Sequence, residues 1–387
     1  MSDLHISPSL RYIGVDDTSI DLFESQYLVP NGVSYNSYLI LDEKIAVMDT
    51  VDRRAAAEWL EKLKNELAGR KPDYLVVHHL EPDHAGSIGL LLEQYPDITL
   101  VGNAKTFSML PKYFPGDYAG RSVTVKEGDA LSLGAHTLTF VMAPMVHWPE
   151  VMVSYESSEK VLFSADGFGK FGALGSEEKW LCEARRYYFN IVGKYGAQVQ
   201  ALLKKAAGLD IQTICPLHGP VLREDLGYYI GKYDLWSRYE PEDEGVLVAY
   251  ASIHGNTAQA AKKFAEILEA RGCARVVLAD LCRDDQAEAV EDAFRYGRMA
   301  VLSPTYDGGL FPAMDHFMAH LRDKTYRNRR VAIVENGSWA PAAAKLMRGY
   351  LDAMKDIEIC PTVHTIQGAV KEGDITVLEQ IAGELLA

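Results

Sequence analysis

The sequence VVHHLEPDHAGS at residues 76–87 decides the fold of the first half of this chain. The two valines end a predicted strand, and residues 85–94 have the pattern of a helix. Between them lie four potential metal ligands on one strand-to-helix loop: His79, Glu81, Asp83 and His84. His78 should point away from His79, because neighbouring side chains of a strand face opposite sides. We expect it to serve packing or to support the ligands.

Three further donors follow other apolar stretches: His147 in APMVHWP, Asp166 in LFSADGFG and His218 in ICPLHGP. Taken alone, His147 or His218 fits an ordinary loop. Strand ends at one rim of a sheet can converge, however, and seven donors are too many for one tetrahedral ion. They suit two metals that share a ligand. Asp166 is the best candidate for that bridge, since a carboxylate offers two oxygens.

The rest of the first half mixes strand-like and helical stretches. This order suits two sheets covered by helices, although periodicity leaves the topology open. The predicted strands are residues 33–41, 44–48, 122–125, 137–142, 151–154 and 160–164, and the predicted helices are 53–68 and 176–207.

A seam separates this half from the next. The sequence YEPEDEG at residues 239–245 is acidic, contains a proline and ends in glycine, so a domain should end there. We place the domains at residues 1–243 and 244–387. Beyond the seam, apolar runs at 246–252, 275–281, 299–305, 331–336 and 357–365 each precede a helical stretch. Alternating strands and helices predict a doubly wound, five-stranded parallel sheet with its ligand at the carboxyl ends of the strands.

Three loops at those strand ends form a candidate nucleotide site. The first combines hydroxyls and a glycine with a helix start, which suits a phosphate. The others add small residues and two aromatic faces, Tyr306 and Trp339, for a planar ring. One phosphate cradle without a GxGxxG turn favours a mononucleotide. The candidate residues are Ser252, His254, Gly255, Asn256, Thr257, Pro304, Thr305, Tyr306, Asp307, Gly308, Gly309, Asn336, Gly337, Ser338 and Trp339.

The composition of the chain excludes some classes of partner and location. A net charge of −15 argues against nucleic acid or an anionic membrane surface as partner. No apolar run is long enough for a membrane helix and no export signal is visible at the start, so we expect a cytoplasmic protein. The five cysteines include no CxxC pair. We expect most of them to be buried as small apolar side chains.

The first 240 residues or so resemble the metallo-β-lactamase fold, an αββα sandwich whose hydrolases carry an HxHxDH loop. Glu81 stands here in place of the second histidine. A carboxylate makes the site harder and more anionic, which favours iron or manganese over zinc and redox chemistry over hydrolysis. Intrinsic affinity nevertheless ranks zinc above ferrous iron. The second half resembles flavodoxin, which binds FMN. Together the halves resemble the flavodiiron proteins over essentially the whole chain.

That resemblance implies two non-haem iron ions and one FMN. One iron would be held by His79, Glu81, His147 and Asp166, and the other by Asp83, His84, Asp166 and His218. Tyr195 and Trp148 resemble residues of the family's substrate pocket. The implied reaction is reduction of dioxygen to water or of nitric oxide to nitrous oxide, with electrons relayed by FMN from a separate donor such as rubredoxin. A head-to-tail homodimer, or a dimer of such dimers, would bring one chain's FMN to the other's irons.

Two other functions remain open at this point. A zinc hydrolase fused to a flavodoxin module would contain zinc without iron and would turn over esters, thioesters or lactams. A non-catalytic electron carrier would leave the first domain as an inactive scaffold, which the complete set of seven donors disfavours.

Overall fold

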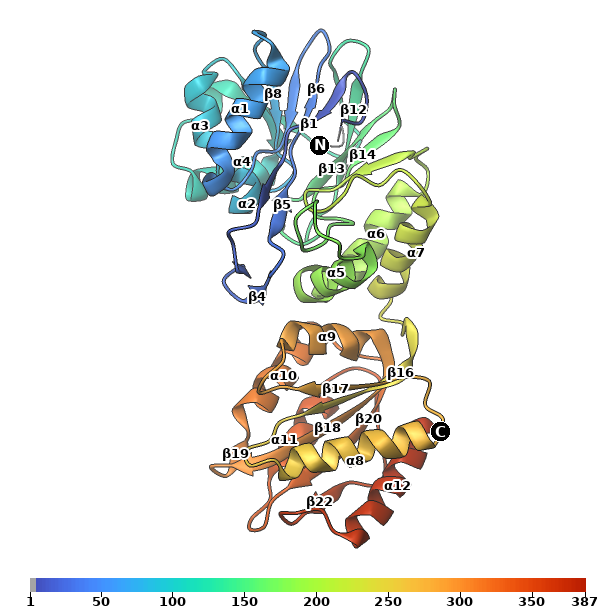
Figure 1. Ribbon diagram of the computed structural model, residues 1–387. Helices are drawn as coiled ribbons and strands as arrows, with labels where there is room; N and C mark the ends of the chain where they lie inside the picture. Colours follow the sequence, from blue (N-terminus) through green and yellow to red (C-terminus); the bar gives the residue numbers. More distant parts are fainter. Residues whose placement is uncertain (1–4) are drawn as a thin grey trace. The chain divides into compact units, whose positions relative to one another are not determined.

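A computed structural model describes residues 5–387, and its Cα positions form two compact units (Figure 1). The first unit runs to Tyr188 and resumes over Ala197–Asp234. The second comprises Phe189–Gly196 and Leu235–Ala387. The proposed domain boundary at 243/244 stays a prediction. Among the described residues, no helix has the length and apolar character needed to cross a bilayer.

The first unit contains two sheets with helices outside them, which confirms the predicted sandwich. One sheet has the order β1-β6-β7-β8-β9-β10 and the other β11-β12-β13-β14-β15. The strands of the first are Leu10–Tyr12, Tyr38–Ile40, Ala46–Met48, Tyr74–Val76, Thr99–Asn103 and Ser122–Val125. Those of the second are Ala130–Ser132, Thr137–Met142, Met152–Glu156, Val161–Phe163 and Thr213–Cys215.

Helices cover the outer faces of both sheets (Figure 1). The blue and teal helices α1 (Ala56–Leu67), α3 (Ile88–Gln94) and α4 (Ala104–Tyr113) lie on the side of the first sheet. The green helices α5 (Trp180–Tyr187), α6 (Gly196–Ala206) and α7 (Leu226–Ser237) lie on the side of the second. Apolar side chains of both sheets meet in a buried core that includes Met48, Val76, Phe140 and Phe163.

Three predicted elements of this unit are divided in the structure. Residues 33–41 form two strands, since β5 (Val33–Tyr35) pairs with β2 (Val15–Asp17) while β6 joins the large sheet. The helix predicted at 85–94 is split into α2 (Pro82–Ala85) and α3 by Gly86 and Ser87. The helix predicted at 176–207 begins only at Trp180, and π and 3-10 turns at Tyr188–Val192 and Gly193–Tyr195 separate α5 from α6. A short antiparallel hairpin, β3 (Leu22–Phe23) and β4 (Tyr27–Leu28), completes the unit together with 3-10 turns at Arg53–Ala55 and Ala119–Arg121.

The second unit is the predicted doubly wound parallel sheet. Its strand order is β17-β16-β18-β20-β21, the order of flavodoxin-like sheets. The strands are Val276–Asp280, Asp243–Tyr250, Tyr296–Tyr306, Arg329–Asn336 and Ile357–Ile359. The last predicted strand resumes as β22 (His364–Ile366) after a break containing Pro361, which has no N–H to donate. A two-residue strand, β19 (Gly309–Leu310), pairs antiparallel with the end of β18.

Five helices enclose this sheet. Apolar residues of α8 (Asn256–Ala270) and α12 (Glu372–Leu386) pack with Val246, Val248 and Leu302 into one buried core. The remaining helices are α9 (Gln286–Arg295), α10 (Pro312–Asp323) and α11 (Ala343–Asp352).

The prediction that most cysteines are buried is wrong. Only Cys215 and Cys360 are buried, whereas Cys182 and Cys282 are exposed and Cys273 is half-buried. Cys282 follows β17 at the sheet rim, so its apolar neighbours in the sequence do not enclose it.

Candidate metal and flavin sites

The first metal-binding candidates lie where β8 leads into α2. Glu81 is the N-cap of that helix and Pro82 occupies its first turn, where a missing N–H costs nothing. Asp83 and His84 follow on the same turn and are buried. The tight helix start therefore turns three donors and His79 toward one place.

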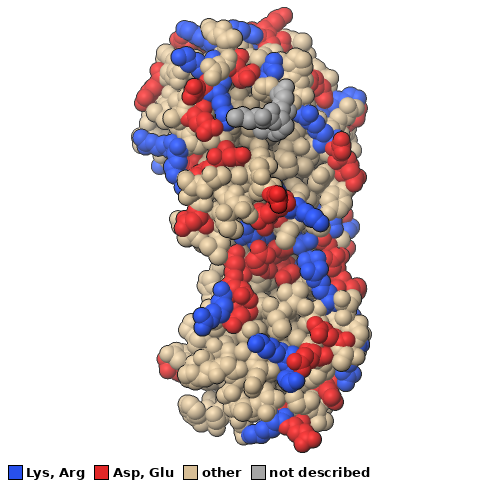
Figure 2. All heavy atoms as spheres, in the orientation of Figure 1, with Lys and Arg blue, Asp and Glu red and all other residues tan. Residues whose placement is uncertain are grey.

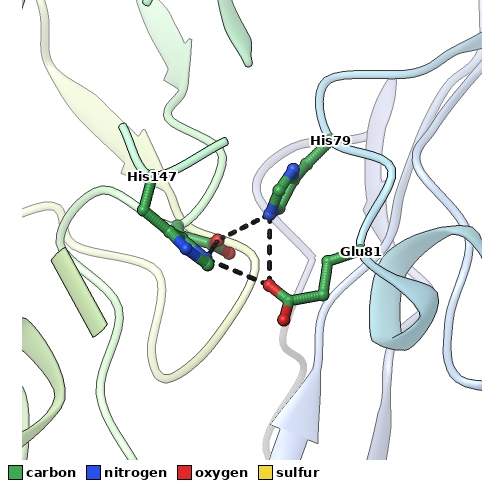
Figure 3. Close-up of side chains that lie close together, drawn as sticks. His79, Glu81 and His147 are labelled. Atoms are coloured by element: carbon green, nitrogen blue, oxygen red, sulfur yellow. Dashed lines mark hydrogen bonds and ion pairs between the residues drawn. The ribbon is translucent and has the colours of Figure 1, made fainter. Parts of the chain in front are cut away.

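One group of donors joins the loop after β8 to two distant loops. Figure 3 shows His79 and Glu81, from the loop after β8, facing His147 from another loop. Glu81 Oε2 lies 3.2 Å from His79 Nε2 and 3.0 Å from His147 Nε2. Asp166 Oδ2 lies 3.3 and 3.2 Å from the same two nitrogens.

A second group lies beside the first. Asp83 Oδ2 is 3.3 Å from His84 Nε2 and 3.2 Å from His218 Nε2. Asp166 Oδ1 is 3.1 Å from His84 Nε2 and 3.9 Å from His218 Nε2. The two oxygens of Asp166 thus face different groups, which is the arrangement expected of a bridging carboxylate. All seven residues predicted from the sequence are brought together.

The chemistry of these atoms fits metal ions. Several are buried without a hydrogen-bond partner: both carboxylate oxygens of Asp83 and Asp166, and Nε2 of His84, His147 and His218. Such atoms are costly to bury unless something else satisfies them. Donors about 2.1 Å from one ion are separated by about 3.0–3.4 Å at octahedral to tetrahedral angles, and most of the distances above fall in that range.

The carboxylates also set the protonation of the metal-free cluster. Burial lowers the pKa of His147, but the facing carboxylates of Asp166 and Glu81 outweigh it and raise the pKa to about 9. Burial likewise opposes the charge of Asp166, yet His79, His84 and His147 hold its pKa well below the usual range. Imidazole and carboxylate therefore favour each other's charged form at this position.

Neighbouring groups orient the imidazoles. Glu150, fully buried, accepts hydrogen bonds from His79 Nδ1 and the backbone N–H of Leu80, both at 2.9 Å. The backbone carbonyl of Ser34 lies 2.8 Å from His218 Nδ1. Glu150, which lies three residues after His147, is not among the residues predicted from the sequence. Its proximity to another candidate ligand was the only local signal.

His78 has a different set of partners. Its Nδ1 lies 2.5 Å from Asp49 Oδ2 and its Nε2 lies 2.7 Å from Ser154 Oγ. The three side chains are arranged like a serine hydrolase triad, but each is at most 2% exposed. No substrate can reach this serine, so the trio fixes the strand before His79, in agreement with the supporting role predicted for His78.

The two predicted pocket residues differ in their placement. Trp148, half-buried, packs edge-on against His79 with ring centroids 5.2 Å apart. Tyr195 lies on the 3-10 turn Gly193–Tyr195, in the segment that belongs to the second unit. The roles of both residues stay predictions.

A polar hollow of about 360 Å³ opens onto the donors. Glu81 and Asp83 line it together with Asp52, Arg54 and Glu24. Burial and the nearby Glu81 carboxylate raise the pKa of Glu24 to about 7. This hollow gives water a route to the candidate metal centre.

The second unit carries a pocket of about 330 Å³ at the carboxyl ends of its strands. Twelve of the fifteen predicted flavin residues line it. Gly255, Tyr306 and Gly309 do not, while Ile253, Ala340 and Gly368 line it without having been predicted. Gly368 follows the resumed strand β22, so its position depended on a break that the sequence pattern did not show.

The loops of this pocket are held by hydrogen bonds between short side chains and the backbone. Gly255, with φ of +91°, is the N-cap of α8, and its N–H donates to Ser252 Oγ at 3.1 Å. Thr305 Oγ1 accepts from the N–H groups of Ala342 and Ala343 at 2.9 and 3.1 Å. The Asn336 amide exchanges two hydrogen bonds with the backbone of Gly368. Trp339 is 82% exposed, so its ring is accessible to a planar ligand.

Comparison with known proteins supports the predicted fold of both halves of the chain. Residues 33–219 match the family described as ODP family beta lactamase. An uncharacterized protein of Methanocaldococcus jannaschii is 30% identical over 329 residues, covering 82% of this chain and 81% of that protein. A nitric oxide reductase of Moorella thermoacetica is 29% identical over 96% of this chain and 94% of its own length.

A solved structure is similar throughout. The rubredoxin oxygen:oxidoreductase of Desulfovibrio gigas superposes with a TM-score of 0.92 at 27% identity, covering 98% of this chain and 96% of that one. Fold and donors thus define a metallo-β-lactamase-like domain with a two-metal donor cluster, joined to a flavodoxin-like domain. The flavodiiron protein of Giardia intestinalis is 25% identical and superposes with a TM-score of 0.92, covering 100% of this chain and 97% of that one. The chain belongs to the flavodiiron protein family.

Proposed function

We propose that this chain is a flavodiiron oxidoreductase that reduces dioxygen to water, nitric oxide to nitrous oxide, or both. The observation that carries the proposal is the pair of buried donor groups sharing Asp166, in one chain with a flavodoxin-like pocket. The names of the relatives from Moorella thermoacetica and Desulfovibrio gigas support the two gases and a rubredoxin-type electron donor.

The ligand assignment follows the two groups. His79, Glu81 and His147 would hold one iron, Asp83, His84 and His218 the other, and Asp166 would bridge them. Bound iron and FMN supply the redox chemistry that no side chain here can supply. Three carboxylates offset the cationic charge and favour iron or manganese over softer metals. Glu150 and the carbonyl of Ser34 keep two imidazoles correctly oriented.

The reaction must balance electrons and protons. Dioxygen takes up four of each to give two waters, whereas two nitric oxide molecules take up two of each to give nitrous oxide and one water. The polar hollow beside Glu81 and Asp83 is the route by which protons enter and water leaves. The loops at Thr257, Thr305 and Trp339 would hold FMN, which would supply electrons taken from the external donor.

The proposed oligomeric state is a head-to-tail homodimer, and the proposed location is the cytoplasm. The family resemblance supports the dimer. The location is supported by the finding that no helix among residues 5–387 could span a membrane. On Figure 2, acidic and basic side chains are mixed on the visible face. This surface and the net charge of −15 give no support to a nucleic-acid partner.

Metal analysis and rapid kinetics test the function. Protein produced with ample ferrous iron should contain two irons and one FMN per chain, and its anaerobically reduced form should be reoxidised by dioxygen or nitric oxide in stopped-flow experiments. Zinc without iron, together with hydrolysis of esters, thioesters or lactams, would contradict the proposal. Full activity of an enforced monomer would contradict the dimer.

A further inference from the structure

The first unit contains an apolar cavity that the proposed reaction leaves unexplained. Its volume is about 220 Å³, and all of its lining residues belong to this unit. Val141, Val153, Leu162 and Ile214 form one wall, from four neighbouring strands of the second sheet. Alternating residues of the same strands, such as Phe140 and Phe163, face the core between the sheets. The cavity therefore lies on the opposite face of this sheet, where α6 and α7 provide the other wall.

The serine of the cavity wall already has a partner, because Ser164 Oγ donates to the carbonyl oxygen of Gly167 at 2.7 Å. The Phe168 and Tyr233 rings pack 4.3 Å apart. A small space with an apolar lining favours apolar guests such as xenon over water.

The same cavity adjoins the candidate metal centre. Ser164, Gly167 and Phe168 line it and lie on either side of Asp166 in the sequence, while Val146 lines it and precedes His147. Gly167 has no space for a side chain, because a Cβ there would lie 2.9 Å from the carbonyl oxygen of Ser164. One tight loop therefore separates the cavity from the bridging carboxylate.

We propose that this cavity binds small uncharged diatomic gases and supplies them to the metal centre. The inference rests on the proposed function, whose substrates are such gases. The polar hollow and the apolar cavity beside the metal centre would then admit different molecules. The hollow lined by Glu24, Asp52 and Arg54 suits water and protons, whereas the cavity concentrates apolar molecules beside Asp166 and His147.

Xenon provides a test that needs no turnover. Crystals of the holoenzyme under xenon pressure should show anomalous density in the cavity between Val153 and Val199. Absence of xenon from this cavity would overturn the inference. Xenon in the cavity of a chain that reduces neither gas would disprove the proposed function and the gas supply, while confirming that the cavity binds apolar gas.

A cavity-filling variant tests the supply role. Val199→Phe, on α6, should displace xenon and raise KM for dioxygen or nitric oxide on the order of threefold, with kcat unchanged. Ala201→Phe adds the same ring at an exposed position of the same helix and should leave both constants unchanged. Val153→Phe repeats the test from the sheet side should Val199→Phe fail to fold. Iron and flavin contents and melting temperatures are measured for each variant. Loss of xenon without a change in KM would overturn the supply role.

Discussion

The two candidate cofactor sites of this chain are built in opposite ways. The metal cluster consists of buried side chains from distant loops, with atoms that lack any other partner. The flavin pocket consists largely of backbone groups and small side chains, and its clearest aromatic residue is 82% exposed. One site therefore depends on a few irreplaceable atoms, and the other on a backbone shape to which many groups contribute. Single substitutions should affect the first site much more strongly.

The largest effect is expected at Asp166. Asp166→Asn should abolish stable binding of both irons and all gas reduction, because its two oxygens face different donor groups. FMN content should be unchanged. Iron by plasma mass spectrometry and flavin by absorbance measure both quantities. Asp73→Asn, which changes a carboxylate paired with Lys44 at the surface, serves as the control. Retention of one firmly bound iron by Asp166→Asn would show that the groups do not share this ligand.

Glu150 tests the metal site without removing a ligand. Glu150→Ala should weaken metal affinity about 10- to 100-fold, because His79 loses the acceptor that orients it. Glu150→Gln keeps an acceptor and should be intermediate. Competition with a chromophoric chelator measures the affinity directly.

The control for Glu150 is another fully buried carboxylate. Glu156 accepts from the backbone N–H groups of Ser158 and Glu159. Glu156→Ala should lower the melting temperature without changing metal affinity. Equal losses of affinity in both variants would mean that Glu150 acts only through general stability.

The contrast between a site made of side chains and a site made of backbone loops also explains what could be predicted from the sequence. The seven residues of the candidate metal site could be predicted because imidazole and carboxylate chemistry is local to each residue, and four of them lie within residues 79–84. Glu150 was missed because its role depends on a partner 71 residues away. The division of residues 33–41 between two sheets was also missed, since pairing partners and not local apolar pattern decide it. The flavin loops were predictable because parallel strands place their carboxyl ends at one rim.

Gly255 tests whether backbone shape governs flavin binding. With φ of +91°, an alanine there is strained by about 1–2 kcal/mol. The free loop can relax, and FMN binding must then restore the strained form. Gly255→Ala should therefore weaken FMN binding roughly tenfold, with iron content unchanged. Gly349→Ala, on an exposed turn of α11 with open space for a Cβ, should leave FMN affinity unchanged. Equal affinity in both variants would exclude a role for the left-handed turn.

The smallest effect is expected at Trp339. Stacking of an exposed ring contributes about 0.5–1.5 kcal/mol, so Trp339→Ala should weaken FMN binding only a few-fold, and Trp339→Phe should recover most of it. Titration of the apoprotein with FMN, followed by flavin fluorescence, measures the difference. Leu346→Ala removes another exposed apolar side chain, on α11, and is the control. A loss larger than that of Gly255→Ala would contradict the comparison, because flavin binding would then depend on one side chain, as metal binding does on Asp166.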